Sequence, residues 1–193
     1  LGRTPGNIVA VRPLRDGVIT DYEMTEKMLE QFLKKINKFT LVKPRVIVSV
    51  PSGITEVEER AVIQAAMEAG ARRVYLIEEP LAAALGAKLA ISGPEGHMVV
   101  DIGGGTADIA VVTMGSISIS KSVKIAGNIL DEDIIRYLRR ERNIVIGEKT
   151  AESIKKRIGC AYLRDTELAI GIKGKHYITG MPITDEVNTT EIY

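Results

Sequence analysis

The sequence has very little of what several classes of protein require. It contains a single cysteine, Cys160, so no disulfide can form within the chain. Its apolar runs are far shorter than the roughly 20 residues that cross a bilayer. The 26 Lys and Arg residues balance 25 Asp and Glu residues, and a net charge of +1 provides no overall field for holding nucleic acid. We therefore expect a cytoplasmic protein from a reducing compartment that binds no nucleic acid.

The histidines and the cysteine are isolated in the sequence and do not indicate a metal site or a catalytic site. His97 and His176 lack the spacing of metal ligands, and Cys160 has no histidine at a motif distance, so we interpret it as a small packing residue. The chain begins with Leu1 and has no basic-then-apolar targeting segment at its start. We expect it to be an internal part of a longer protein.

The composition is that of a globular protein, with 45% hydrophobic and 26% charged residues. In the first half, apolar periodicity predicts a helix from Asp21 to Ile36, a strand at 45–50, a helix at 56–69, a strand at 74–77 and a helix at 81–90. Thr55 and Glu58 have the spacing of a capping box, and Gly70 is typical of a helix end. Alternating strands and helices predict an α/β fold.

The second half changes to a meander. We expect a strand at 98–102, two strands joined at Met114 and Gly115, helices at 129–138 and 150–158, and short strands over 167–187 with turns at 174–175 and 180–182. The charged segment 139–142 is expected to be a solvated helix end. Residues 190–193 have the pattern of the first turn of a helix. The simplest interpretation is two α/β lobes that meet near Gly103.

The segment from Asp101 to Thr106 carries the clearest chemistry. Gly103, Gly104 and Gly105 have no Cβ, so their backbone N–H groups can approach an anion closely and form a nest for phosphate oxygens. Thr106 adds a hydroxyl, and Asp101 can hold a hydrated Mg²⁺ ion against the phosphates. The alternative is an ordinary glycine-rich hairpin tip.

Two glutamates form a second candidate feature. If the strand that ends at Ile77 lies parallel to the strand that ends at Ile102, both ends open onto one crevice, where α/β sheets place ligands. Glu78 or Glu79 can then orient a water molecule for attack on a terminal phosphoryl group. The alternative is that acids at a helix start only favour the helix dipole.

A third feature is a helical pair one turn apart. Glu152 and Lys155 share a face, so a ribose hydroxyl can meet the carboxylate while the lysine stem lies along a base. The same pattern is also common on solvated helices.

These motifs resemble, in order and over essentially the whole chain, those of the MreB family of rod shape-determining bacterial actins. The matching segments are residues 1–7, 12–13 with 16–19, 50–55, 77–80 with 82–84, 99–106, and 146–148 with 150–152. The resemblance implies an incomplete actin-like ATPase fold with ribonuclease H-like lobes. Residues 1–96 would be part of the first lobe, residues 97–137 the start of the second lobe, and residues 138–193 its small subdomain.

The same resemblance implies roles for single residues. Glu79 would activate water with help from Thr106, and Asp101 would be the carboxylate on the Mg²⁺ side. The ATP-binding residues would be Gly103, Gly104, Gly105, Thr106, Gly127, Glu152, Ser153, Ile154 and Lys155. The family implies a cytoskeletal ATPase that forms filaments with itself at the inner face of the cell membrane. Its further partners would be membrane proteins of cell shape and wall synthesis.

Some positions depart from the family pattern. Asp108 stands where the family usually has Glu, and Asn128 where it usually has Asp. The family's first phosphate loop and its adenosine-side glycine loop have no counterpart within this sequence. A cleft that clamps a nucleotide needs both phosphate hairpins, so we expect the chain alone to bind ATP poorly and to be inactive.

Leu41 and Val42 form an apolar pair between basic residues. A small apolar tip with cations beside it can dip into an anionic membrane surface. The resemblance implies a membrane-inserting loop at this place, whereas the residues alone equally suit the start of a buried strand.

Two other activities share this fold. A small-molecule kinase would need an insertion for its acceptor, and we find none in the sequence. A heat-shock-type chaperone would need a substrate domain, which these residues do not contain. Filament pelleting that depends on nucleotide would distinguish a polymerising ATPase from both.

Overall fold

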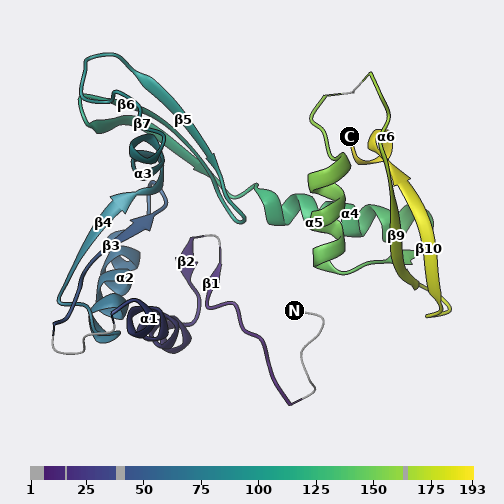
Figure 1. The fold of residues 1–193 in the computed structure, drawn as a ribbon, viewed down its shortest axis with the longest axis horizontal. Helices are drawn as coiled ribbons and strands as arrows, with labels where there is room; N and C mark the ends of the chain where they lie inside the picture. Colours follow the sequence, from purple (N-terminus) through teal and green to yellow (C-terminus); the bar gives the residue numbers. More distant parts are fainter. Residues whose placement is uncertain (1–6, 16, 38–41, 163–164) are drawn as a thin grey trace. The chain divides into compact units, whose positions relative to one another are not determined.

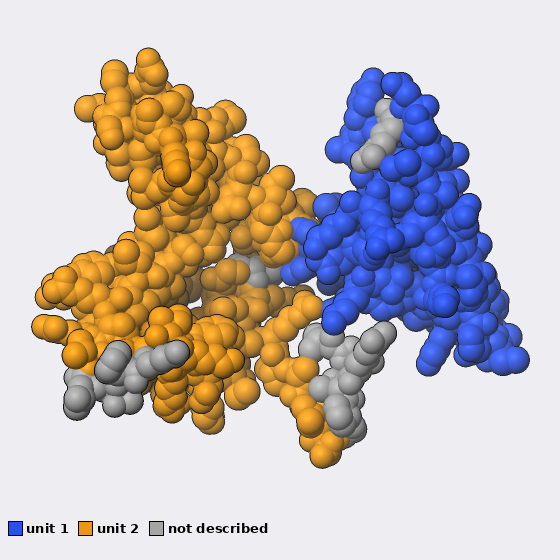
Figure 2. All heavy atoms as spheres, in the orientation of Figure 1, with its two compact units in different colours: residues 1–3, 127–193 blue, residues 4–126 orange. Residues whose placement is uncertain are grey.

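The computed structural model describes residues 7–15, 17–37, 42–162 and 165–193 of the chain. The chain separates into two compact units, which Figure 2 shows in different colours. We call residues 4–126 the N-terminal unit and residues 127–193 the C-terminal unit. The three lobe segments that the resemblance implies, with limits at residues 96 and 137, stay a prediction.

The first half of the N-terminal unit contains a βαβ arrangement, which follows a short hairpin and a helix (Figure 1). Its first elements are the short antiparallel pair β1 (Leu14–Arg15) and β2 (Val18–Ile19), then α1 (Tyr22–Ile36), β3 (Arg45–Val50), α2 (Glu56–Glu68) and β4 (Arg73–Glu78). β3 and β4 pair in parallel, with Val50 opposite Glu78. These bounds confirm the predicted helices and strands to within a few residues.

Local sequence determines where α2 begins and ends. The Thr55 hydroxyl accepts a hydrogen bond from the Glu58 N–H at 3.3 Å, and the Glu58 carboxylate accepts one from the Thr55 N–H at 2.7 Å. This reciprocal capping box stabilises a helix start by about 1 kcal/mol. Gly70 has φ +111°, the left-handed conformation in which glycine ends helices at little energetic cost. Both signals confirm the sequence prediction.

The alanine-rich helix is shorter than predicted. α3 (Glu79–Gly86) starts two residues before Leu81, with Pro80 in its first turn, and it ends four residues before Ala90. Lys88 adopts φ +58°, and its N–H donates to the Leu85 carbonyl at 3.0 Å. This left-handed residue turns the chain away from the helix axis. The helix therefore ends at Gly86, although the residues that follow have a high helix propensity.

The second half of the N-terminal unit is an antiparallel sheet of β5 (His97–Ile102), β6 (Ala107–Thr113) and β7 (Ser116–Val123). Met114 and Gly115 both have positive φ, as a tight hairpin between β6 and β7 requires. Side chains on one face of the sheet pack with those around α3 in a core that includes Ala84, Ile91 and Val112.

The strands that end at Ile77 and Ile102 belong to different sheets. The sequence left open whether these two strands lie parallel to each other. In the described part of the chain, β4 pairs with β3 in one sheet and β5 pairs with β6 in another. α3, which contacts β4, β5 and β6, connects the two sheets instead.

The C-terminal unit packs helices on an antiparallel sheet of its own (Figure 1). Its elements are α4 (Gly127–Arg142), β8 (Ile144–Val145), α5 (Glu148–Ile158), β9 (Ala169–His176), β10 (Pro182–Asn188) and α6 (Thr189–Ile192), with the strand order β10-β9-β8. Its core contains Ile134, Leu138, Ile144, Ile154 and Val187, all buried. α4 continues through the charged segment 139–142, which forms its largely exposed C-terminal end, as expected.

Gly174 is not in a turn, contrary to the sequence prediction. It lies inside β9, where a Cβ would approach the Val145 carbonyl oxygen to 2.7 Å and the Ile144 Cγ2 atom to 2.8 Å. The glycine therefore allows β8 to pack closely against β9. The turn between β9 and β10 contains Gly180, with φ +69°, as predicted.

Candidate functional site

The glycine hairpin connects β5 to β6. The Gly103 N–H donates a hydrogen bond of 2.9 Å to the Thr106 carbonyl, which closes the turn. A Cβ at Gly103 would lie 3.3 Å from the same oxygen. Because the Gly103 amide is used within the hairpin, the amides of Gly104, Gly105 and Thr106 are the better candidates for an anion nest.

Two carboxylates lie at the base of this hairpin. Asp101 on β5 is directly opposite Asp108 on β6, so their side chains share one face of the sheet. Asp108 is 1% exposed, and one of its oxygens accepts a hydrogen bond of 3.2 Å from the Ser52 backbone N–H. Paired like charges in a partly buried place are unfavourable unless a donor or a cation compensates them.

Glu79 belongs to the same electrostatic group. Burial raises the pKa of this half-buried glutamate, and the charges of Asp108 and then Asp101 raise it further. Glu79 at the start of α3 thus lies within electrostatic range of Asp101 on β5, and both are predicted site residues. Asp108 completes the group, and the sequence had marked it only as a departure from the family pattern.

The two consecutive glutamates have different surroundings. Glu78 ends β4, and its carboxylate accepts a hydrogen bond of 2.8 Å from the Ser52 hydroxyl. Glu79 starts α3 and interacts electrostatically with Asp101 and Asp108. The sequence left open which glutamate would act on water, and the structure gives each of them a distinct environment.

The donor chemistry here suits Mg²⁺ held through water. Oxygen ligands are the ones that Mg²⁺ prefers, and it usually keeps several of its waters. Among the described residues, no three His, Cys, Asp or Glu side chains are arranged to hold a metal ion directly. The like charges that raise the Glu79 pKa would be relieved by a cation, so the residues fit a hydrated ion beside Asp101.

The C-terminal unit contains the other predicted nucleotide residues. The Lys155 ammonium donates to the Gly127 carbonyl at 2.6 Å and forms an ion pair of 2.8 Å with Asp131. Glu152 instead pairs with Lys156 at 2.6 Å, and this hydrogen bond lowers the Glu152 pKa. The structure therefore brings Gly127 and Lys155 together, while the Glu152 carboxylate pairs with Lys156.

Two neighbours on α5 differ in accessibility. Ile154 is 0% exposed and belongs to the core of the C-terminal unit, so its side chain is not available to a ligand. Ser153 is half-buried. Any contact of Ile154 with a nucleotide would have to involve its backbone.

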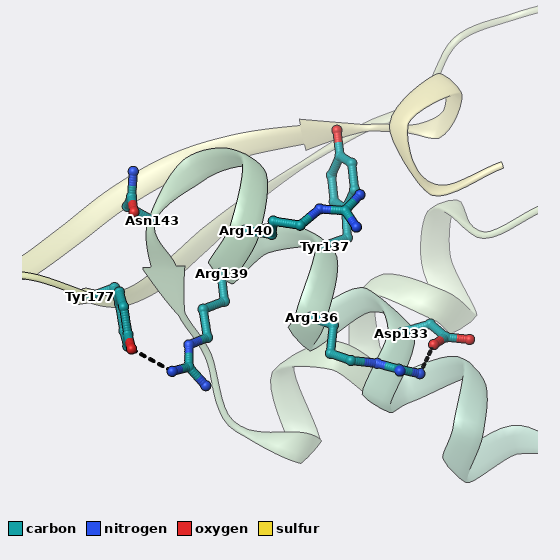
Figure 3. Close-up of a pocket in the computed structure, with 7 residues that line it drawn as sticks. All are labelled: Asp133, Arg136, Tyr137, Arg139, Arg140, Asn143 and Tyr177. Atoms are coloured by element: carbon teal, nitrogen blue, oxygen red, sulfur yellow. Dashed lines mark hydrogen bonds and ion pairs between the residues drawn. The ribbon is translucent and has the colours of Figure 1, made fainter.

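Two cavities differ in their relation to these residues. A cavity of about 490 Å³ in the N-terminal unit is lined by Ser52 and Thr106 together with further hydroxyl side chains and Lys124. A cavity of about 660 Å³ in the C-terminal unit is lined by Asp133, Arg136, Tyr137, Arg139, Arg140, Asn143 and Tyr177, none of them a predicted site residue (Figure 3).

The arginines in Figure 3 already have partners. Arg136 pairs with Asp133, Arg140 pairs with Glu141, and the Arg139 guanidinium lies over the Tyr177 ring, 4.2 Å from its centroid. The smaller cavity is the one that adjoins the glycine hairpin, because Thr106 is among the residues that line it.

The expected membrane-contact pair is only partly described. Leu41 lies outside the described residues. Val42 is 64% exposed, and its carbonyl accepts a hydrogen bond of 2.8 Å from the Asn37 side chain. It precedes β3 by three residues, so it does not belong to that strand, in which only Val50 is buried. Within the described ranges, every helix is too short or too polar to span a lipid bilayer.

Sequence reasoning missed Ser52 and Asp131. Both act through contacts between residues far apart in the chain, and no local motif marks such contacts. The turn formed by Pro51, Ser52 and Gly53 was the only available signal, because it showed that Ser52 follows a strand end.

Comparison with known proteins gives the relationship. The family model described as MreB/Mbl protein matches residues 1–193. The chain is 49% identical to the cell shape-determining protein Mbl of Bacillus subtilis (strain 168) and 51% identical to the cell shape-determining protein MreB of Escherichia coli (strain K12). These matches cover 100% of this chain and 58% and 56% of the two relatives.

Solved structures agree with this result. The crystal structure of MreB5 of Spiroplasma citri bound to ADP matches with a TM-score of 0.91 and 41% identity, covering 100% of this chain and 58% of that one. The same values hold for MreB5 bound to AMPPNP. A structure described as the MamK double helical filament matches at a TM-score of 0.77 and 21% identity, covering 93% of this chain and 55% of that one.

The fold is therefore part of the actin-like fold of bacterial cytoskeletal proteins. More specifically, the chain belongs to the MreB/Mbl family, as the sequence motifs predicted. It spans just over half the length of the relatives that it matches.

Proposed function

We propose that this chain carries part of the nucleotide site of a bacterial actin that binds ATP with Mg²⁺ and hydrolyses it. The observation that carries this proposal is the group of Glu79, Asp101 and Asp108 at the base of the Gly103–Thr106 hairpin. The nucleotide-bound structures of MreB5, at 41% identity over the whole chain, support ATP as the ligand.

Each residue of the N-terminal unit has a definite task in this proposal. The amides of Gly104, Gly105 and Thr106 bind phosphate oxygens, and Asp101 is the residue that would hold a hydrated Mg²⁺ ion. When bound, Mg²⁺ would neutralise charge on the phosphates. Glu79 accepts a proton from the attacking water, because its raised pKa makes it a stronger base than an ordinary glutamate. The Thr106 hydroxyl helps to hold that water.

In the C-terminal unit we propose that α4 and α5 contact different parts of the nucleotide. Glu152 binds the ribose, with its carboxylate kept ionised by Lys156. Lys155 is committed to Gly127 and Asp131, so it fixes the backbone at the start of α4 and does not lie along the base. Gly127 approaches the nucleotide, and Ser153 also contacts the nucleotide.

For the whole protein we propose polymerisation into filaments at the cytoplasmic face of the inner membrane, where they organise wall synthesis and set rod shape. The cell shape-determining relatives support the role in shape. The family membership and the actin-like fold, which MamK shares, support self-association. Leu41 and Val42 would contact the membrane, and membrane proteins of wall synthesis would be further partners.

A chimera tests the enzymatic proposal. Residues 1–193 replace the matching segment of Bacillus subtilis Mbl, so that the site is completed by a relative that is 49% identical. We expect the chimera to release phosphate from ATP and to pellet when nucleotide is added. Replacement of the base by Glu79→Gln should lower the rate of phosphate release about 100-fold or more.

Several outcomes decide the result. A Glu79→Gln chimera that releases phosphate at the parental rate would exclude Glu79 as the base. Transfer of phosphate to an added hydroxyl compound, without pelleting, would favour a kinase over a filament. The unsubstituted chimera and parental Mbl are the controls for folding and activity.

A further inference from the structure

We propose that the cavity shown in Figure 3 docks an extended acidic segment of another protein, in which carboxylate side chains occupy alternate positions. We call this cavity of about 660 Å³ the arginine groove. Its lining residues lie between Asp133 and Asn143, at the C-terminal end of α4, and are joined by Tyr177. None of them has a task in the proposed hydrolysis of ATP, so the inference goes beyond that function and does not depend on it.

The arginine groove has an excess of positive charge. Its lining contains three arginines but a single carboxylate, that of Asp133. The Arg139 guanidinium lies over the Tyr177 ring, 4.2 Å from its centroid, and donates to the hydroxyl of that ring. In the part of the chain that the structure describes, Arg139 has no carboxylate partner, and a neutral phenol does not cancel its charge. A carboxylate is therefore the group that complements this position.

The other two arginines can exchange their present partners. Arg136 pairs with Asp133 and Arg140 pairs with Glu141, but the two arginine side chains are 71% and 80% exposed. Exposed ion pairs contribute little to stability, because water screens them and two long side chains must be ordered. An incoming carboxylate can thus replace either partner at little cost.

The spacing of these arginines favours an extended polypeptide. Arg136 and Arg140 are four residues apart on α4, which separates them by about 6 Å along the helix axis. In an extended chain, side chains two residues apart point to the same side and are separated by about 7 Å. Acids at alternate positions can therefore meet both arginines, whereas adjacent acids point to opposite sides.

Asn143 adds a group that suits a peptide backbone. It follows α4 with φ +54°, and its own carbonyl accepts a hydrogen bond of 2.7 Å from the Tyr177 N–H, which fixes this corner. Its exposed side-chain amide has no hydrogen-bond partner among the described residues. An amide both donates and accepts, as a peptide group does, whereas a phosphate offers mainly acceptors. The net charge of +1 also gives no long-range attraction for nucleic acid.

The experiment measures peptide binding to the chimera with Mbl in the absence of nucleotide, by fluorescence anisotropy. The probe is a fluorescein-labelled heptapeptide in which serine and glutamate alternate. A second heptapeptide has the same composition with its three glutamates adjacent, and a third has glutamine in place of glutamate. We expect the alternating peptide to bind about fivefold tighter than the clustered one and at least about tenfold tighter than the glutamine peptide.

Variants test the arginines separately. Arg139→Gln, and Arg136→Gln combined with Arg140→Gln, should each weaken binding of the alternating peptide about tenfold. The matched control is Arg60→Gln, which changes an exposed arginine on α2 that pairs with Glu56 at 3.3 Å, and it should bind like the parent. Thermal unfolding reports on the fold of each variant. If Arg139→Gln lowers the thermal midpoint, the double variant decides.

The contrary outcomes are distinct. Equal affinity for the alternating and clustered peptides, or parental affinity in both groove variants, overturns the proposal. Tighter binding of a single-stranded oligonucleotide or of anionic vesicles at the same arginines would assign the groove to another class of partner and overturn it. Loss of pelleting with ATP in the groove variants, with peptide binding unchanged, would make the groove a contact between copies and also overturn it. Because no nucleotide is present, failure of Glu79→Gln to lower hydrolysis leaves the peptide results unaffected.

Discussion

The ammonium group of Lys155 on α5 lies 2.6 Å from the carbonyl oxygen of Gly127, the first residue of α4, and 2.8 Å from a carboxylate oxygen of Asp131. The two charged side chains are only 23% and 15% exposed. This contact joins the two helices of the C-terminal unit at the backbone position that we propose to face the nucleotide.

Replacing Lys155 should weaken the C-terminal unit measurably. Lys155→Met keeps the length of the side chain but leaves Asp131 without its cation, so we expect the free energy of unfolding to fall by about 2 kcal/mol. Urea unfolding followed by circular dichroism measures this change. Lys156→Met is the control, because its pair with Glu152 is solvent-exposed and should contribute little to stability. Equal losses in the two variants would contradict the proposed role of the Lys155 contact.

The close packing of β8 against β9 gives a second test. A Cβ at Gly174 would lie 2.7 Å from the Val145 carbonyl oxygen, so Gly174→Ala should force the strands apart and destabilise the chain by about 1–3 kcal/mol. A Cβ at Gly171, on the same strand, would have nothing within 4 Å, so Gly171→Ala should change stability by about 0.5 kcal/mol or less. Thermal unfolding of the two variants compares them directly. Parental stability in Gly174→Ala would show that β8 can move away from β9 without loss.

The raised pKa of Glu79 predicts how stability depends on pH. Folding disfavours the ionised carboxylate of Glu79. The protonated side chain therefore contributes to stability below the pKa of the unfolded chain, and this contribution is lost as the pH rises through the higher pKa of the folded chain. At neutral pH, Glu79→Gln should therefore be more stable than the parent. The difference should shrink as the pH falls through this window. A variant that is less stable than the parent at neutral pH would show that the charge of Glu79 is compensated in the folded chain.

Contact with the membrane can be tested at the apolar pair. In the chimera, Leu41→Ser with Val42→Ser should reduce sedimentation with anionic liposomes several-fold, because less apolar surface enters the headgroup region. The matched control is Val57→Ser, which changes an exposed valine elsewhere in the chain, on α2. This variant should sediment like the parent. Unchanged sedimentation of the double variant would exclude these residues as the contact.

Local signals in the sequence predicted much of the fold. The capping box of Thr55 and Glu58 and the left-handed Gly70 define α2, and the β-branched run before Pro51 defines β3. These signals are reliable because they act between residues close in the chain. The presence of Asp101 next to the glycine hairpin was also readable, since a strand end and a turn are adjacent in sequence.

Features that depend on partners far away in the chain could not be predicted from the sequence. Gly174 was interpreted as a turn residue because glycine often marks turns, whereas its role is to accommodate β8. Helical spacing placed Lys155 on one face with Glu152 and predicted that its stem lies along a base, but Asp131 and Gly127 hold that lysine. The grouping of Glu79 with Asp108 arises from packing around α3, which no pattern within one segment encodes.

The hydrogen bond that closes the Gly103–Thr106 turn has a consequence for affinity. A loop that is already folded loses little conformational entropy when an anion binds to it. Discrimination between triphosphate and diphosphate should then arise from the atoms that differ between those ligands, with only a small contribution from ordering of the backbone.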